Sequence, residues 1–288
     1  MWYQGEADSS HPGGFHDDGY NCTFPTMIAD WRLQWSRLSN GTTSPSFPFG
    51  FVQLNGNGAT PTFNNPPEAP GGDYSAAYGF AGLRWSQTAG YGYAPNPRMP
   101  NTFMAVAMDT PNPTGGVHSG FKRPVGSRLA RAGLAQAYSV PVKGLTARVA
   151  SVGKVTGSSD GGGDGGGGTV TVTLSGAGGA GGVALHNDTG FEVLVRPNTS
   201  ALGQWFSTPI IGHTATTVTV GNVPAAALRI RYEWYGNACG LSLFGCAVYT
   251  NVAPLPGGFD GALPFLPLAP FVAAIPSAAK DRHQPNVA

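Results

Sequence analysis

The chain has 288 residues with a net charge of +1, and charged residues make up only 11% of it. This balance excludes the basic field of a nucleic-acid-binding protein and an acidic interaction tail. No run of about 18 apolar residues occurs, which excludes a membrane-spanning helix. We expect no signal peptide, because Met1 leads directly into Trp-Tyr-Gln-Gly-Glu. The length predicts two domains, and 44 glycines and 25 prolines favour loops and short strands.

Residues 1–140 alternate between helical and strand patterns. Apolar runs of strand length lie at 47–54 (FPFGFVQL) and 101–109 (NTFMAVAMD), and Trp2 marks a further strand end. Strands separated by helices indicate a parallel sheet with helical cover, although two full strands are few for a stable sheet. The predicted helices lie at 24–35, with Pro25 in the first turn, at 74–88 and at 122–138.

From about residue 142 the pattern changes to short β-branched or alternating runs. These runs predict a small all-β sandwich over residues 141–275. The Gly-rich segment 157–168 is expected to be a flexible loop, and the Pro/Ala-rich end should fray into a flexible tail at 276–288. The predicted strands lie at 145–155, 169–174, 190–195, 216–220 and 228–234.

Three cysteines offer one plausible pair. Cys239 and Cys246 lie in a strand-rich region and are close enough in sequence to close a small loop as a disulfide. Cys22 either pairs with a cysteine upstream of this sequence or is a buried free thiol. The Asn-x-Ser/Thr triplets favour a secretory compartment only weakly, and they lie at Asn21, Asn40, Asn187 and Asn198.

The start of the chain combines groups that a hydrolase needs beside an acyl centre. Gln4 offers an amide, Gly5 a backbone N–H and Glu6 a carboxylate at a strand end. His118 follows the strand that ends at Asp109, at the sheet edge where α/β folds collect ligand chemistry, and can act as a general base. The structural alternative is a loop histidine bonded to backbone and an aspartate that caps a turn.

Several sequence blocks resemble sialate O-acetylesterases. The resemblance is specific from residue 2 to about 140 and continues weakly through Arg231-Tyr232-Glu233-Trp234, the paired cysteines and Gln284-Pro285-Asn286-Val287. The blocks that carry it lie at 2–6 (WYQGE), 20–25 (YNCTFP), 30–32 (DWR), 48–54 (PFGFVQL), 84–85 (RW), 87–89 (QTA), 95–97 (PNP) and 99–109 (MPNTFMAVAMD).

The resemblance implies an SGNH-type esterase domain with a three-layer α/β/α fold, present here only in part, followed by β modules. Such enzymes remove acetyl groups from sugar hydroxyls, including the 9-O-acetyl group of sialic acids. They require no metal or organic cofactor. Family members are lysosomal, secreted or cytosolic, which makes a secreted or lysosomal location the expectation, although no address is visible in this chain.

The resemblance also assigns roles to single residues. Gln4 and Gly5 match the block that helps to form the oxyanion hole, and Glu6 matches the acidic residue that orients the histidine. His118 matches the catalytic histidine that follows the last core strand. Asp109 matches the aspartate that ends this strand and is the second choice for the triad acid.

Three positions depart from the family pattern. The nucleophilic serine lies in a Gly-Gln-Ser-Asn block upstream of Trp-Tyr-Gln-Gly-Glu in relatives, and no such block occurs here. Val117-His118-Ser119 replaces Ile-His-Pro, and Gly115 replaces the aspartate that many SGNH enzymes place before the histidine, which favours Glu6 as the acid. Because loss of a nucleophile costs on the order of 10⁶ in rate, we expect this C-terminal portion to be inactive alone.

Two alternatives remain open. A substitute serine, such as Ser9, Ser86 or Ser119, would restore a nucleophile. Alternatively, the chain is a non-catalytic carbohydrate-binding or interaction protein with a degenerate esterase half. In that case four aromatic residues of the β module would form a sugar-stacking platform, although they equally fit a sandwich core: Trp205, Phe206, Trp234 and Tyr235.

Overall fold

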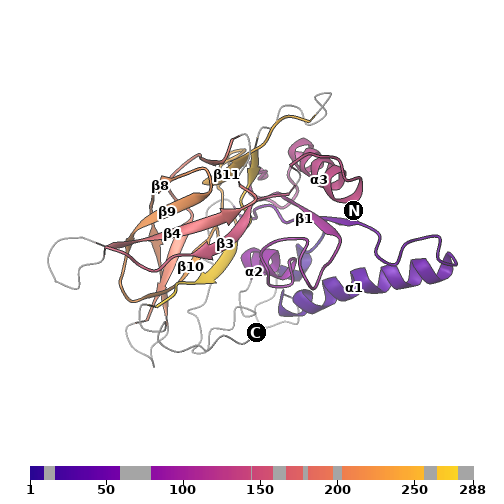
Figure 1. Cartoon of the computed structure of the whole chain (residues 1–288), viewed down its shortest axis with the longest axis horizontal. Helices are drawn as coiled ribbons and strands as arrows, with labels where there is room; N and C mark the ends of the chain where they lie inside the picture. Colours follow the sequence, from indigo (N-terminus) through magenta and orange to yellow (C-terminus); the bar gives the residue numbers. More distant parts are fainter. Residues whose placement is uncertain are drawn as a thin grey trace.

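The computed structural model of the chain describes residues 1–9, 17–58, 79–143, 145–157, 167–177, 181–196, 203–255 and 265–277. The helices and parallel strands come from the first half of the chain, and the antiparallel strands come from the second half (Figure 1). The elements of the first half are η1 (Ala7–Ser9), α1 (Asp17–Leu38), β1 (Phe49–Gln53), α2 (Gly79–Ser86), β2 (Thr102–Val106) and α3 (Lys122–Ala137).

Parallel strands form the centre of the first half. β1 and β2 pair in parallel over their whole length, and every residue of both strands is buried. Trp2 forms a parallel bridge with Phe51, so the start of the chain runs beside β1 as a third strand end. The predicted strands at 47–54 and 101–109 are confirmed, because burial on both faces produces continuous apolar runs.

Helix α1 begins well before the position that its sequence pattern predicts. Pro25 lies inside the helix, not in its first turn. The additional turns are held by packing, since Tyr20 and Phe24 are buried and Phe24 meets Phe51 edge-on with 5.2 Å between ring centroids. Tertiary contacts therefore outweigh the backbone hydrogen bond that proline cannot donate.

The other predicted helices are confirmed. α3 matches the prediction at 122–138, and α2 lies within the prediction at 74–88, of which residues 74–78 lie outside the described ranges. In the ranges that the structure describes, no helix combines the length and the apolarity that a membrane crossing needs.

The second half is built from antiparallel sheets. Their strand orders are β13-β10-β6-β7, β12-β11-β5 and β3-β4-β9-β8. The strands are β3 (Arg148–Val152), β4 (Gly168–Ser175), β5 (Val183–Leu185), β6 (Phe191–Val195), β7 (Gln204–Thr208), β8 (Ile210–His213), β9 (Thr217–Val223), β10 (Ala227–Tyr232), β11 (Val248–Asn251), β12 (Phe265–Pro267) and β13 (Phe271–Ala274).

The core of this half is a sandwich. Along β4, Val170, Val172 and Leu174 alternate with partly exposed residues and are buried, as the period of a strand requires. They share one hydrophobic cluster with Val193 of β6 and Ile230 of β10. The fold class predicted from the sequence, an α/β part followed by a sandwich-like all-β part, is confirmed.

The strands β12 and β13 were not predicted individually, although both lie within the range 141–275 that was predicted for the sandwich. In β13, Phe271 pairs with Tyr232 of β10 and is buried. This partner lies far upstream, so no local pattern signals the pairing. The rest of the predicted tail, 278–288, lies outside the described residues, as does 158–166 of the predicted Gly-rich loop, whose last residue begins β4.

The two halves share a core. Tyr249 and the cysteines Cys239 and Cys246 belong to the same buried cluster as Phe49 and Phe51 of β1. Residues after 234 therefore pack against the first half of the chain. The domain boundary near residue 140 remains a prediction, because this return contact crosses it.

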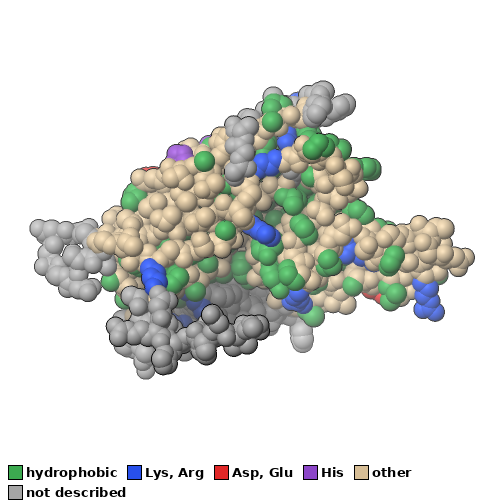
Figure 2. Space-filling view, in the orientation of Figure 1, with side chains coloured by type: hydrophobic (Ala, Val, Ile, Leu, Met, Phe, Trp, Pro, Cys, Tyr) green, Lys and Arg blue, Asp and Glu red, His purple; other side chains and the backbone are tan. Residues whose placement is uncertain are grey.

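Exposed hydrophobic side chains gather on the helical half of the face in Figure 2. On α1, Leu33 is 60% and Leu38 79% exposed. We expect the isolated chain to self-associate through this surface, since large exposed apolar patches drive association.

Sedimentation velocity should show oligomers of the parent chain. The double variant Leu33→Lys, Leu38→Lys should form fewer of them. Ile211→Lys on β8, also exposed, is the control, and an equal effect there would contradict the assignment to α1.

Candidate active site

The parallel strands bring their carboxyl ends to one edge of the sheet. Gln4–Glu6 follow the Trp2 bridge, Asn55 follows β1, and Asp109 follows β2. Two backbone hydrogen bonds join Trp2 to β1. The N–H of Trp2 donates to Gly50 O at 2.9 Å, and the N–H of Val52 donates to Trp2 O at 2.9 Å. This edge is where an open α/β sheet positions ligands.

Gln87 joins two of these strand ends. Its side chain is fully buried, and its Nε2 donates to Gln4 O at 3.3 Å and to Val52 O at 3.1 Å. Its Oε1 accepts the N–H of Leu54 at 3.0 Å. One buried amide thus fixes the Gln4 backbone relative to the end of β1.

Gly5 occupies a conformation that only glycine adopts without strain. Its φ is 136°, and a Cβ at this position would lie 2.9 Å from Leu83 Cδ2. A side chain would therefore displace the backbone between Gln4 and Glu6. The sequence Gln-Gly-Glu requires its glycine for this geometry.

The amide of Gln4 is oriented by two neighbours. Its Nε2 donates to Asp8 Oδ2 at 2.6 Å, and its Oε1 accepts the hydroxyl of Tyr20 at 3.2 Å. The same hydroxyl accepts a hydrogen bond from Trp2 Nε1 at 3.2 Å. The helix α1 thus supplies a support for Gln4 that the sequence pattern did not reveal.

Glu6 lies half-buried beside Tyr3 and near the start of α3. Burial and the negative charge of Glu6 raise the pKa of Tyr3 to about 12, so the phenol stays protonated. Lys122, the first residue of α3, holds its Nζ 4.9 Å from the centroid of the Tyr3 ring. α3 follows the His118 loop directly, so this contact links the two segments that carry the predicted acid and base.

His118 is exposed on a loop that is held from both sides. Asn55 Nδ2 donates to Val117 O at 3.0 Å, and the N–H of Gly58 donates to Gly115 O at 2.7 Å. Both anchors come from the segment after β1. Within the described part of the chain, the imidazole makes no hydrogen bond, so the structure brings His118 and Glu6 to one edge without joining them.

Asp109 is fully buried in an ion pair. Arg128 of α3 donates from Nη1 to Oδ1 at 2.6 Å and from Nη2 to Oδ2 at 2.7 Å. Tyr249 of β11 donates its hydroxyl to Oδ2 at 3.0 Å. Burial, with the nearby carboxylate, raises the pKa of Tyr249 and keeps this donor protonated. Both oxygens face Arg128, and no hydrogen bond in the described ranges joins Asp109 to His118.

Arg84 connects the candidate site to the second half of the chain. It is fully buried and donates to Leu54 O at 2.8 Å, Asn55 O at 2.6 Å, Tyr235 O at 2.8 Å and Gly236 O at 2.9 Å. Burial lowers its pKa to about 10. Sequence reasoning assigned no role to Arg84, Gln87 or Asn55. For Arg84, the available signal was a charged residue within the otherwise apolar helix GFAGLRWS, which indicates a buried and bonded guanidinium.

The cysteines and aromatic residues have structural surroundings. Cys239 and Cys246 form a disulfide. Their sulfurs lie within 4.8 Å of a Glu233 oxygen, but bonded sulfurs offer no thiolate to a metal. Cys22 is an exposed free thiol, so the alternative of a buried thiol is wrong.

The predicted aromatic platform is not assembled. Trp234 is 2% exposed and packs on Trp85, whereas Trp205 lies over the guanidinium of Arg231 at 4.1 Å from its ring centroid. Phe206 is 47% exposed. Trp234 is therefore a core residue, as the alternative interpretation of the four aromatic residues as sandwich core expected.

Known proteins match both the sequence and the fold. Residues 168–259 match the Sialate O-acetylesterase C-terminal domain. The sialate O-acetylesterase of Homo sapiens is 43% identical over 141 residues, 48% of this chain and 24% of that protein. The Mus musculus sialate O-acetylesterase is 42% identical over the same length, 23% of that protein. The chain is thus similar to sialate O-acetylesterases, and the match spans about a quarter of the length of these relatives.

A solved structure shares the fold. The crystal structure of a carbohydrate acetylesterase from Xanthomonas citri superposes with a TM-score of 0.62 and 22% identity, over 94% of this chain and 49% of that chain. The likeness extends over both halves of the chain. The family and the fold thus agree with the expectation drawn from the blocks at 2–6 and 99–109.

Proposed function

We propose that this chain supplies the base, the acid and the oxyanion-binding groups of a carbohydrate O-acetylesterase. One observation carries the proposal: the ends of three parallel strand segments bring Gln4, Gly5, Glu6 and the anchored His118 loop to one edge of the sheet. The substrate class is an acetylated sugar, as the name of the family suggests.

The proposed reaction is acyl transfer in two steps. His118 Nε2 takes the proton of a serine hydroxyl, whose oxygen attacks the acetyl carbonyl, while Gln4 and the Gly5 N–H stabilise the oxyanion. His118 then returns the proton to the departing sugar oxygen. Water repeats the sequence on the acetyl-serine and releases acetate. Glu6 orients the imidazole, whereas Asp109, paired with Arg128, positions α3 behind the histidine loop.

The three serines considered as substitute nucleophiles have other surroundings. Ser119 is 4% exposed, and its hydroxyl donates to Pro111 O at 3.0 Å. Ser86 is also buried, and Ser9 donates its hydroxyl to Glu6 O at 2.6 Å. Together with the lack of a Gly-Gln-Ser-Asn block in the 288 residues, this supports the proposal that the chain is inactive alone.

The test is hydrolysis of 4-nitrophenyl acetate by the purified chain and by His118→Ala. We expect both to stay at the background rate, because the base has no nucleophile to activate. A rate that the substitution abolishes would place a nucleophile within these residues and contradict the inactivity.

Co-expression with the N-terminal part of a sialate O-acetylesterase, carrying the Gly-Gln-Ser-Asn block, tests the roles of the residues. Acetate release from an acetylated sugar should appear with the parent chain and be absent with His118→Ala or Glu6→Gln. Asp109→Asn is the comparison, and activity that survives in Glu6→Gln but not in Asp109→Asn, at equal folding, would reverse the assignment of the acid.

A further inference from the structure

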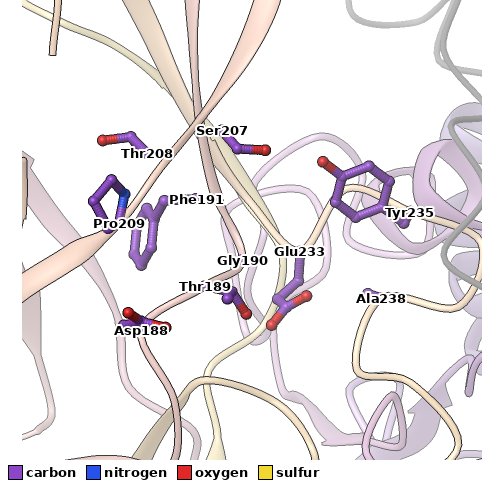
Figure 3. A pocket seen from close by; sticks show the side chains of 10 residues that line it. All are labelled: Asp188, Thr189, Gly190, Phe191, Ser207, Thr208, Pro209, Glu233, Tyr235 and Ala238. Atoms are coloured by element: carbon purple, nitrogen blue, oxygen red, sulfur yellow. The ribbon is translucent and has the colours of Figure 1, made fainter. Parts of the chain in front are cut away.

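A cavity of about 430 Å³ lies in the second half of the chain, beside the end of β10 (Figure 3). This volume lies within the range of about 300–1,000 Å³ that small-molecule sites occupy. Its walls include Asp188, Phe191, Ser207, Glu233 and Tyr235. None of these residues has a role in the proposed acyl transfer.

The backbone is shaped to admit the carboxyl group of Glu233. Gly190 has a φ of 90°, and a Cβ there would lie 2.6 Å from Glu233 Oε1. The N–H of Glu233 donates to Gly190 O at 2.8 Å, which holds the two strands at this distance. Glu233 is 2% exposed, and Figure 3 shows its carboxyl group beside Thr189, at the same end of the cavity as Asp188.

The opposite wall carries hydroxyl groups. Ser207 lies exposed in β7, and Tyr235 is 9% exposed. Their hydroxyl groups point toward each other in Figure 3. Burial raises the pKa of Tyr235, so its phenol remains a hydrogen-bond donor. The ring of Tyr235 adds apolar surface, whereas Phe191, also in the lining, is 1% exposed and packs against Tyr232.

The charge of the cavity disfavours anions. No lysine or arginine is among the described residues that line it. Two guanidinium groups act on the lining residues, Arg84 on Glu233 and Arg231 on Tyr235. Arg84 donates to four backbone carbonyls, and Arg231 holds its Nε 2.7 Å from Glu192 Oε2 and lies over the ring of Trp205. Burial raises the pKa of Glu233 to about 8, so at neutral pH this group is largely a neutral acid that can donate and accept hydrogen bonds.

We propose that this cavity binds a neutral sugar residue of the carbohydrate, through hydrogen bonds to Glu233, Asp188 and Ser207. Sugar hydroxyls both donate and accept, which suits carboxyl and hydroxyl groups on facing walls. The apolar face of the sugar ring packs against Tyr235. The choice of ligand class rests on the proposed function, whereas the site rests on the cavity itself.

The cavity and the candidate active site share a wall. The segment that contains Tyr235 continues into Gly236, whose carbonyl accepts the N–H of Asn57 at 3.1 Å, and Asn237, whose Nδ2 donates to Gly58 O at 2.8 Å. Gly58 in turn contacts the His118 loop.

Direct binding to the chain tests the proposal without any hydrolysis. Saturation-transfer NMR and amide shift titrations with methyl β-galactoside, a neutral probe, should give binding in the millimolar range. The methyl glycoside of N-acetylneuraminic acid, an anionic probe, should bind at least fivefold more weakly. Ser207→Trp fills the cavity from its exposed rim and should lower the affinity for the neutral probe at least tenfold.

Ser151→Trp is the matched control, because Ser151 is exposed on β3 in the other sheet. It should leave binding unchanged. No binding of the neutral probe at tens of millimolar, equal or tighter binding of the anionic probe, or full binding by Ser207→Trp would each overturn the proposal. None of these results bears on the esterase assignment, which is read from acetate release.

Discussion

Replacing Asp109 by alanine is expected to lower the free energy of unfolding by about 3–5 kcal/mol, the usual cost of removing one partner of a buried ion pair. The side chains of Arg128 and Asp109 are 3% and 0% exposed. Without the carboxylate, the Arg128 guanidinium keeps its bond to Val106 O at 2.8 Å and its place over the ring of Phe244, but it loses its counter-charge. The hydroxyl of Tyr249 loses its acceptor. Urea denaturation monitored by circular dichroism measures the change.

A double replacement separates the lost charge from the lost packing. Asp109→Leu combined with Arg128→Met removes both charges and should recover most of the stability, because apolar pairs often replace buried ion pairs at little cost. Tyr249→Phe should cost about 1 kcal/mol, the typical value of one hydrogen bond. An Asp109→Ala variant as stable as the parent would contradict the structural role and favour Asp109 as a catalytic group.

The second large effect is a loss of stability as the pH rises, caused by Glu233. Burial raises the pKa of Glu233 from 4.5 to about 8, and the charge of Glu192 on β6 adds to the shift. Arg84 of α2, the Ala247 N–H and the Tyr232 hydroxyl of β10 act in the opposite direction. The folded state therefore binds the proton more tightly than the unfolded state does.

The sign of the pH dependence follows from this difference. The stabilising contribution is complete below about pH 4.5 and is lost as the pH rises to about 8. Within this window Glu233 lowers the free energy of unfolding by up to about 1.4 kcal/mol per pH unit, since one more proton is bound in the folded state. Denaturation midpoints between pH 5 and 9 measure this slope.

Glu233→Gln is the control for the pH dependence, because glutamine keeps the shape and stays neutral. Its slope should be flatter than that of the parent over the same window, and it should be the more stable protein above pH 8. Subtracting the two curves removes the contributions of the histidines. Parallel curves would show that Glu233 does not carry the effect.

The helical half shows what local patterns can predict. The runs FPFGFVQL and NTFMAVAMD form buried parallel strands, because a strand covered on both faces must be apolar at every position. The start of α1 was missed because its first turns depend on Tyr20 and Phe24 packing against β1, and propensity places a proline at the beginning of a helix. β13 was missed for the same kind of reason, since its partner is β10.

The candidate site divides in the same way. Gln4, Gly5, Glu6 and His118 were predicted from the sequence, because strand order and sequence blocks indicate that they lie at one sheet edge, and their catalytic roles remain a proposal. Their supports were not found. Gln87 acts across the chain on Gln4, and Arg84 acts on Tyr235 and Gly236, so both depend on contacts between segments that are distant in sequence.

The sequence by itself determined the resemblance to sialate O-acetylesterases, the alternation of the first half and the alternating strands of the sandwich, because each is written in local periodicity or in short blocks. Only the tertiary structure decided that Asp109 is enclosed by Arg128, that Arg84 joins the two halves, and that Glu233 lines a cavity whose described lining contains no lysine or arginine. Burial and partner identity are properties of contacts between distant segments, and these exist only once the chain has folded.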